Sequence, residues 1–158
     1  MKEILNAILE RLAALPELKY VDENWGQMNI AQSPAKFPMA LVDVESVEFS
    51  NMGNHVQEGE ARITVTIAAL RLSNSSSGAP AAQRRSNFEF YDLLTAAHCA
   101  LHHWRPANHA GLMVRLAQRR IDSADGYKIT ELTYGVRYRQ QGAQQYTQAV
   151  NPQLKVEN

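Results

Sequence analysis

The sequence predicts a single α+β domain in which a mostly antiparallel sheet carries two main helices packed on one face. Its 158 residues are near the usual size of one domain and can bury a core without disulfides or metals. Hydrophobic residues make up 45% and charged residues 20%, as in ordinary globular proteins. Residues 1–140 hold the periodic segments, in the order helix, strands, long loop, helix, hairpin, which such a sheet accommodates. Residues 141–158 have no periodicity, and we expect a flexible C-terminal tail there.

The first element is an amphipathic helix that ends before Pro16, because a proline disfavours the helical conformation of the residue before it. Its apolar residues recur at spacings of three and four: Ile4, Leu5, Ile8, Leu9, Leu12 and Leu15. This stripe predicts a helix that packs on the sheet. Residues 18–32 are less regular, and Tyr20, Val21 and Trp25 could belong to a short strand.

Two strands are expected next. Residues 39–49 alternate between two faces, but the alternation breaks partway, which indicates either a bulge or a strand buried on both faces. Residues 61–72 hold the clearest strand, since isoleucine and valine alternate there with arginine and threonine. Residues 52–59, between the two strands, are polar and include two glycines. We therefore expect an exposed connection at this point.

The middle of the chain predicts a loop followed by a long helix. Residues 74–80 are of low complexity and have no useful apolar face, so we expect a mobile segment over residues 73–83. A helix over about residues 82–104 follows, and Pro106 ends it. The face expected to pack on the sheet consists of Phe88, Tyr91, Leu94 or Thr95, His98, Leu101 and Trp104 or Arg105.

The last periodic segment predicts a β-hairpin. Strands over residues 112–122 and 127–140 flank an Asp-Gly step, which is a strong hairpin signal. One face of the second strand is apolar or aromatic and consists of Leu132, Tyr134, Val136 and Tyr138. We expect this face to belong to the core.

The charge and cysteine content exclude several classes of protein. Sixteen basic and sixteen acidic side chains give a net charge of zero, whereas nucleic-acid binders usually carry an excess of basic charge. We therefore expect no direct recognition of nucleic acid. The single cysteine, Cys99, cannot form an internal disulfide. Neither a signal peptide nor a membrane span is expected, because the chain lacks a suitable apolar run.

A metal site is the strongest chemical candidate. His98 and His102 lie four residues apart on the expected helix, so their imidazoles could converge on one ion, and Cys99 and His103 repeat that spacing on an adjacent stripe. The glutamate of the metalloprotease pattern is absent, however, and so are phosphate-binding glycine loops. The simpler interpretation is an ordinary helix face. We expect no catalytic residues, no metal and no cofactor, with a small metal-binding domain or enzyme as the alternative.

Basic side chains form two doublets and one strip along a strand: Arg84, Arg85, Arg119, Arg120, Arg137 and Arg139. They could simply balance acidic residues elsewhere on the surface. They could also contact an acidic surface on a neighbouring subunit, where charge sets the docking register. We treat these six arginines as candidate interface residues.

The order and lengths of the elements over residues 1–140 resemble those of phage tail-terminator, or tail-completion, proteins of the minor tail protein U type. The resemblance covers the opening helix, the segment Phe37-Pro38-Met39-Ala40-Leu41-Val42 that leads into the first long strand, and the strand at 61–72. It continues through the helix at 88–104 and the closing strand at 127–139. The expected loops at 52–59 and 73–83 then become candidate contact segments.

The resemblance implies a structural phage or prophage protein and no enzyme. Such a protein forms a ring, usually of six subunits, that caps the tail tube and stops its polymerisation. Its partners would be further copies of itself, the tail tube protein and the head-tail connector protein, with no membrane and no cofactor. It would be found in the host cytoplasm during assembly and in the virion tail afterwards. An adaptor of another tail-like injection machine is the alternative.

Overall fold

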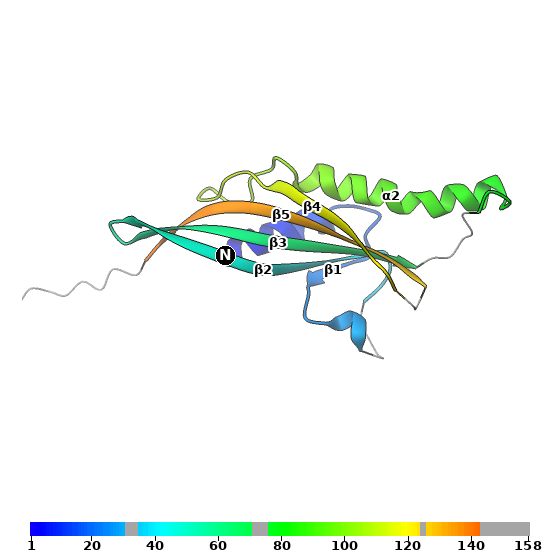
Figure 1. Ribbon diagram of the computed structural model, residues 1–158, viewed down its shortest axis with the longest axis horizontal. Helices are drawn as coiled ribbons and strands as arrows, with labels where there is room; N and C mark the ends of the chain where they lie inside the picture. Colours follow the sequence, from blue (N-terminus) through cyan, green and yellow to red (C-terminus); the bar gives the residue numbers. More distant parts are fainter. Residues whose placement is uncertain (31–34, 71–75, 124–125, 143–158) are drawn as a thin grey trace, which may run out of the picture.

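The computed structural model describes residues 1–30, 35–70, 76–123 and 126–142, which form a five-stranded sheet and two main helices (Figure 1). The elements are α1 (Lys2–Ala13), β1 (Tyr20–Glu23), η1 (Gln27–Asn29), β2 (Met39–Gly53), β3 (Val56–Leu70), α2 (Ala81–Leu101), β4 (Val114–Ile121) and β5 (Tyr127–Gln141). The strand order is β1-β2-β3-β5-β4. Only the short β1 runs parallel to its neighbour. The predicted α+β class is confirmed.

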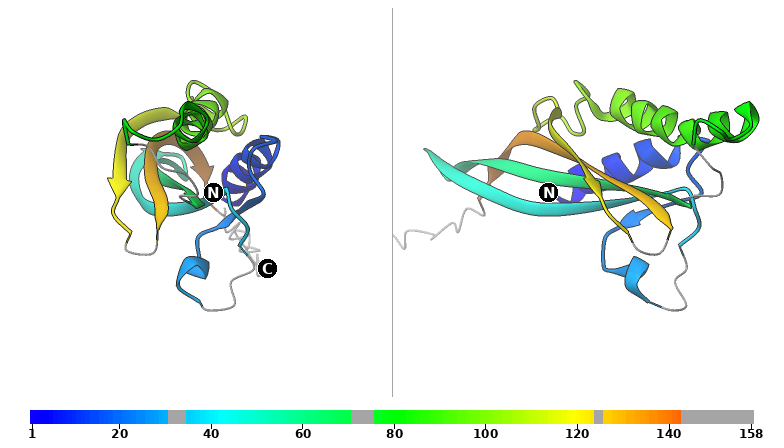
Figure 2. Two further views of the ribbon diagram at one scale, coloured as in Figure 1. Left: turned by 90° about the vertical axis from the view of Figure 1, so that its right-hand side faces the viewer. Right: turned by 45° about the vertical axis from the view of Figure 1, so that its right-hand side comes forward.

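Both helices share one core with one face of the sheet (Figure 2). The predicted α1 stripe is confirmed, since Ile4, Ile8 and Leu12 are fully buried. Alternate residues of β3 and β5 face them: Ala61, Ile63, Val65, Ile67, Leu132, Tyr134, Val136 and Tyr138. Side-chain contacts join the two helices near their C-terminal ends. Arg11 of α1 lies 4.6 Å above the Trp104 ring and donates a hydrogen bond to the Ala100 carbonyl.

Strand β2 shows both features that its broken alternation allowed. Met39 to Val42 are all buried, because a second small cluster covers the opposite face of the sheet. That cluster consists of Met39, Leu41 and Ala68, with Tyr20, Met28, Ala35, Phe37 and Ile129 packed against them. Farther along, the register with β3 shifts between Val44 and Ser46, which marks a bulge.

The expected exposed connection over residues 52–59 is wrong. Strand β2 runs to Gly53 and β3 starts at Val56, so only Asn54 and His55 form the turn. Both have positive φ, 49° and 61°, as tight hairpin turns require. The polar composition was misleading because the end of this hairpin is exposed to solvent and needs no apolar face.

The region before and within α2 also differs from expectation. Helix α2 begins at Ala81, so the last part of the expected loop at 73–83 is helical, and residues 73–75 lie outside the described residues. The helix ends at Leu101. Its buried residues are Asn87, Phe90, Leu93, Leu94, Ala97 and Leu101. The expected face was right at Leu94 and Leu101, which are buried, and wrong at Phe88 and Tyr91, which are 54% and 55% exposed. In place of these two, the residues one position earlier are buried, about 100° around the helix.

The short strand predicted near Tyr20 is confirmed as β1, but Trp25 lies beyond it. The Trp25 ring is 55% exposed and its Nε1 donates to Asp22 at 3.2 Å. The buried Gln27 accepts from the Trp25 backbone N–H and donates to the Glu23 carbonyl, which fixes this bend.

At the other end of the chain, the predicted hairpin of β4 and β5 is confirmed. The expected tail at 141–158 begins with Gln141, which is the last residue of β5, and residues 143–158 lie outside the described part. In the described part, neither helix is both long and apolar enough to span a membrane.

Candidate functional site

The three histidines lie close together at the end of α2, where the His98 ring stacks on His102 and the His103 ring is tilted against His102. The ring centroids of His98 and His102 are 4.7 Å apart, and those of His102 and His103 are 4.5 Å apart. Nδ1 of His102 accepts the Arg115 backbone N–H at 3.2 Å, which anchors the ring to the start of β4. Burial, with the nearby Arg115 and His102, lowers the pKa of His98. Among the described residues, no three His, Cys, Asp or Glu side chains are grouped to hold a metal.

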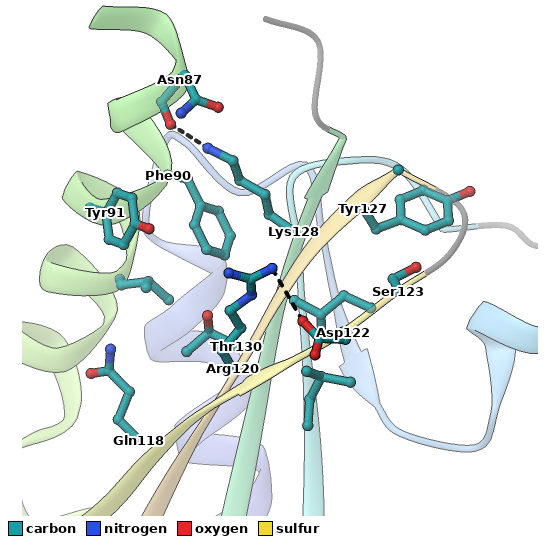
Figure 3. Close-up of a pocket in the computed structure, with 14 residues that line it drawn as sticks. Asn87, Phe90, Tyr91, Gln118, Arg120, Asp122, Ser123, Tyr127, Lys128 and Thr130 are labelled. Carbon is teal, nitrogen blue, oxygen red and sulfur yellow. Dashed lines mark hydrogen bonds and ion pairs between the residues drawn. The ribbon is translucent and has the colours of Figure 1, made fainter. Parts of the chain in front are cut away.

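A groove of about 430 Å³ lies between α2 and the β4–β5 hairpin (Figure 3). Its charged side chains are already engaged. Arg120 pairs with Asp122 at 3.1 Å, and Lys128 donates to the Asn87 carbonyl while its ammonium lies near the Phe90 and Tyr91 rings. The contacts of Lys128 join the hairpin to α2. The residues that line the groove include no nucleophile with a histidine beside it.

The six candidate arginines do not form one basic patch. Arg84 donates to the Ser77 carbonyl at 2.7 Å and Arg85 is exposed, both on the first turns of α2. Arg120 points into the groove, on the helix side of the sheet (Figure 3). The other three, Arg119, Arg137 and Arg139, share the face of the sheet that lies away from the helices, which we call the open face.

Most charged residues of the open face follow one order across its strands. Its acidic residues stand mainly on β2 and β3 and its arginines mainly on β5 and β4, with Arg62 on β3 and Glu131 on β5 as the exceptions. The rows of directly opposed residues are Glu48–Glu60–Arg137, Ser50–Glu58–Arg139 and Leu41–Thr66–Glu131–Arg119. Two contacts within these rows are ion pairs, Arg137–Glu60 at 3.1 Å and Arg119–Glu131 at 2.8 Å. The β2 side of the face is therefore acidic and the β4 side is basic.

Sequence reasoning missed an exposed apolar strip along β4. Leu112, Val114 and Leu116 are 46%, 41% and 53% exposed. Their spacing of two predicts one face of a strand, and the usual inference from such a face is burial in the core. The available signal was Arg115 within the strip and Arg119 and Arg120 just after it, because arginine is enriched at interfaces.

Comparison with known proteins agrees with the fold. The family model described as phage tail terminator protein matches residues 4–145. No curated protein matches the chain. Among solved structures, a chain of the virion of a native gene transfer agent (GTA) particle has a similar fold, with a TM-score of 0.54 and 9% sequence identity. The alignment covers 85% of this chain and 93% of that chain. The chain belongs to the phage tail terminator protein family, and it is a structural component of a phage tail.

Proposed function

We propose that this chain forms a ring, of six subunits, that caps the tail tube, ends its polymerisation and offers a surface for head-tail joining. The observation that carries the proposal is the match of the tail terminator family over nearly the whole chain. The ring acts by binding alone. Its partners are other copies of the chain, the tube protein and the connector protein, first in the host cytoplasm and then in the virion tail.

The charge order of the open face supports a ring. A head-to-tail ring buries one patch of each subunit against a different patch of the next, so the two patches must complement each other. The open face has most of its acidic residues on the β2 side and most of its arginines on the β4 side. The zero net charge of the chain leaves little repulsion to oppose such association.

Growth of the tail tube tests the proposal. The purified tube protein is polymerised with and without the chain, and tube lengths and ends are measured by negative-stain electron microscopy. A cap should shorten the tubes as its concentration rises and leave a ring at one end of each tube. The control adds the chain after polymerisation has finished, when it should decorate ends without changing lengths. Unchanged lengths and undecorated ends at a large excess of the chain would contradict the proposal.

A further inference from the structure

The sheet has two free edges. Strand β1 pairs with β2 only from Met39 to Val42, and in the described residues the remainder of β2, Asp43 to Gly53, has β3 on one side and no strand on the other. Strand β4 is the last strand at the opposite side. Figure 1 shows these two strands along the two long borders of the sheet. An unpaired edge is a ready template for pairing with another chain.

Strand β4 is unusually exposed to solvent for an edge strand. All of its residues from Val114 to Arg120 are exposed, although they include two large apolar side chains. The first part of its outer edge is occupied by the preceding loop, because the Arg115 N–H bonds to His102 and Met113 exchanges backbone hydrogen bonds with His103 and Trp104. Residues 116–121 therefore form the part of the edge that is free to pair.

The two edges carry opposite charges. From Met39 to Gly53, β2 has Asp43, Glu45 and Glu48 and no basic residue. Strand β4 has Arg115, Arg119 and Arg120 and no acidic residue. Each edge also exposes large apolar side chains, Phe49 and Met52 on β2 and Leu116 on β4. The chain thus presents a surface and its complement on opposite sides of the same sheet.

We infer that β4 of one subunit pairs edge to edge with the segment 43–53 of β2 in the next copy, so that the sheet continues from subunit to subunit. The inference rests on the proposed ring and specifies its contact. Pairing of β4 with a second β4 is disfavoured, because arginines would oppose arginines. Strands β2 and β4 run in opposite directions within one subunit, so rotation about an axis parallel to the strands makes the new pair antiparallel.

The internal ion pairs of β4 do not oppose this contact. In the Arg119–Glu131 pair the arginine side chain is 72% exposed, and in the Arg120–Asp122 pair both side chains are more than four-fifths exposed. Exposed pairs contribute little to stability. The Arg119 guanidinium, which lies on the open face, can therefore turn toward a neighbouring carboxylate at small cost.

Two charge-reversed variants test the contact without damaging the fold. Glu48→Lys reverses the charge at the centre of the acidic edge, and because Glu48 lies directly opposite Glu60, it also removes a like-charge pair. The double variant Arg119→Glu/Glu131→Arg reverses the charge at the centre of the basic edge and keeps the internal ion pair with its polarity exchanged. Residues 48 and 119 each lie near the centre of their free stretch.

Alone, each variant places like charges at the centre of every subunit contact. We expect its association, measured by native mass spectrometry with the tube protein present, to be at least tenfold weaker than that of the wild-type chain. Mixed in equal amounts, the two variants restore opposite charges at both kinds of contact. The mixture should form rings with equal numbers of the two chains. If each variant assembles as well as the wild type, or the mixture does not recover, the contact is wrong while the ring stands. A wild-type chain that forms no ring with the tube protein overturns the proposed function itself.

Cross-linking measures the same contact when association is weak. In a Cys99→Ser background, which removes the one exposed natural thiol, Glu48→Cys and Ala117→Cys are made as separate chains of different mass. A short bismaleimide should join the two chains to each other and leave each one alone largely unlinked. Equal self-linking of Ala117→Cys would indicate pairing of two β4 strands and overturn the inference.

Discussion

The Tyr134 hydroxyl provides a sharp test of the core. Tyr134 is fully buried at the centre of β5, and among the described residues its hydroxyl has no hydrogen-bond partner. Burial raises the pKa of Tyr134 to about 12. A buried hydroxyl without a partner costs about 1–3 kcal/mol in proteins. Tyr134→Phe keeps the ring and removes that cost, so we expect the free energy of unfolding at pH 7 to rise by about 1 kcal/mol.

Urea unfolding followed by circular dichroism measures this change, and the melting temperature should rise by roughly 2–4 °C. The alkaline behaviour gives a second signature. The folded pKa of Tyr134 lies above the unfolded value of 10.0, so the wild-type chain binds more protons when folded and loses stability as pH rises from about 10 to about 12. Tyr134→Phe removes this contribution. The matched control is Tyr91→Phe, whose ring is 55% exposed and which should change stability by less than about 0.5 kcal/mol. A loss of stability in Tyr134→Phe would refute the reasoning and indicate a bonded hydroxyl.

Three further variants test other parts of the fold, each by urea unfolding. Ile8→Ala should cost about 2–5 kcal/mol because Ile8 is fully buried between α1 and the sheet, whereas Glu10→Ala on the exposed face should cost little. Gly59→Ala should cost about 1–3 kcal/mol, since its new Cβ would lie 2.8 Å from the Tyr138 ring, and a neutral result would show that the ring moves aside freely. The pKa of His98 is lowered, so its contribution to stability is present above the unfolded pKa of 6.5 and is lost as pH falls below it. His98→Phe should reduce that acid loss, and an unchanged pH profile would contradict the assignment.

The fold class and most elements followed from the sequence because each has one dominant pattern. The α1 stripe and the apolar face of β5 repeat at the periods of a helix and a strand. The short turn between β2 and β3 was missed for a physical reason. Polar residues and glycines argue against a strand only where that strand would need an apolar face toward the core. The end of this hairpin is exposed, so its two strands need no such face.

The orientation of α2 shows a second limit. The helix carries two adjacent apolar stripes, one through Phe88 and Tyr91 and one through Phe90, Leu93 and Leu94. Periodicity indicates that a helix forms, but it does not decide which of two stripes meets the sheet. Tertiary contacts decide that, and here the stripe with the two exposed aromatic rings faces away from the core.

The candidate interface was predictable in composition but not in geometry. The six arginines were identified from the sequence. Alternation along β4 puts Arg119 and Arg120 on opposite faces, but only the pairing of β4 with β5 shows that Arg119 shares its face with Arg137 and Arg139. The acidic complement on β2 appears only when β2 and β4 are seen to be opposite edges of one sheet. Strand order depends on long-range pairing, which local patterns do not encode.

Native mass spectrometry of the wild-type chain with its tube protein, across a series of concentrations, tests the ring most directly. The account predicts one closed oligomer of six subunits that persists as the concentration falls, with no ladder of smaller species. In a closed ring the free strand edge of every subunit is paired with a neighbour, so no open edge remains to favour partial rings. An open ladder of dimers, trimers and longer chains, or a monomer at every concentration with the tube protein present, would contradict it.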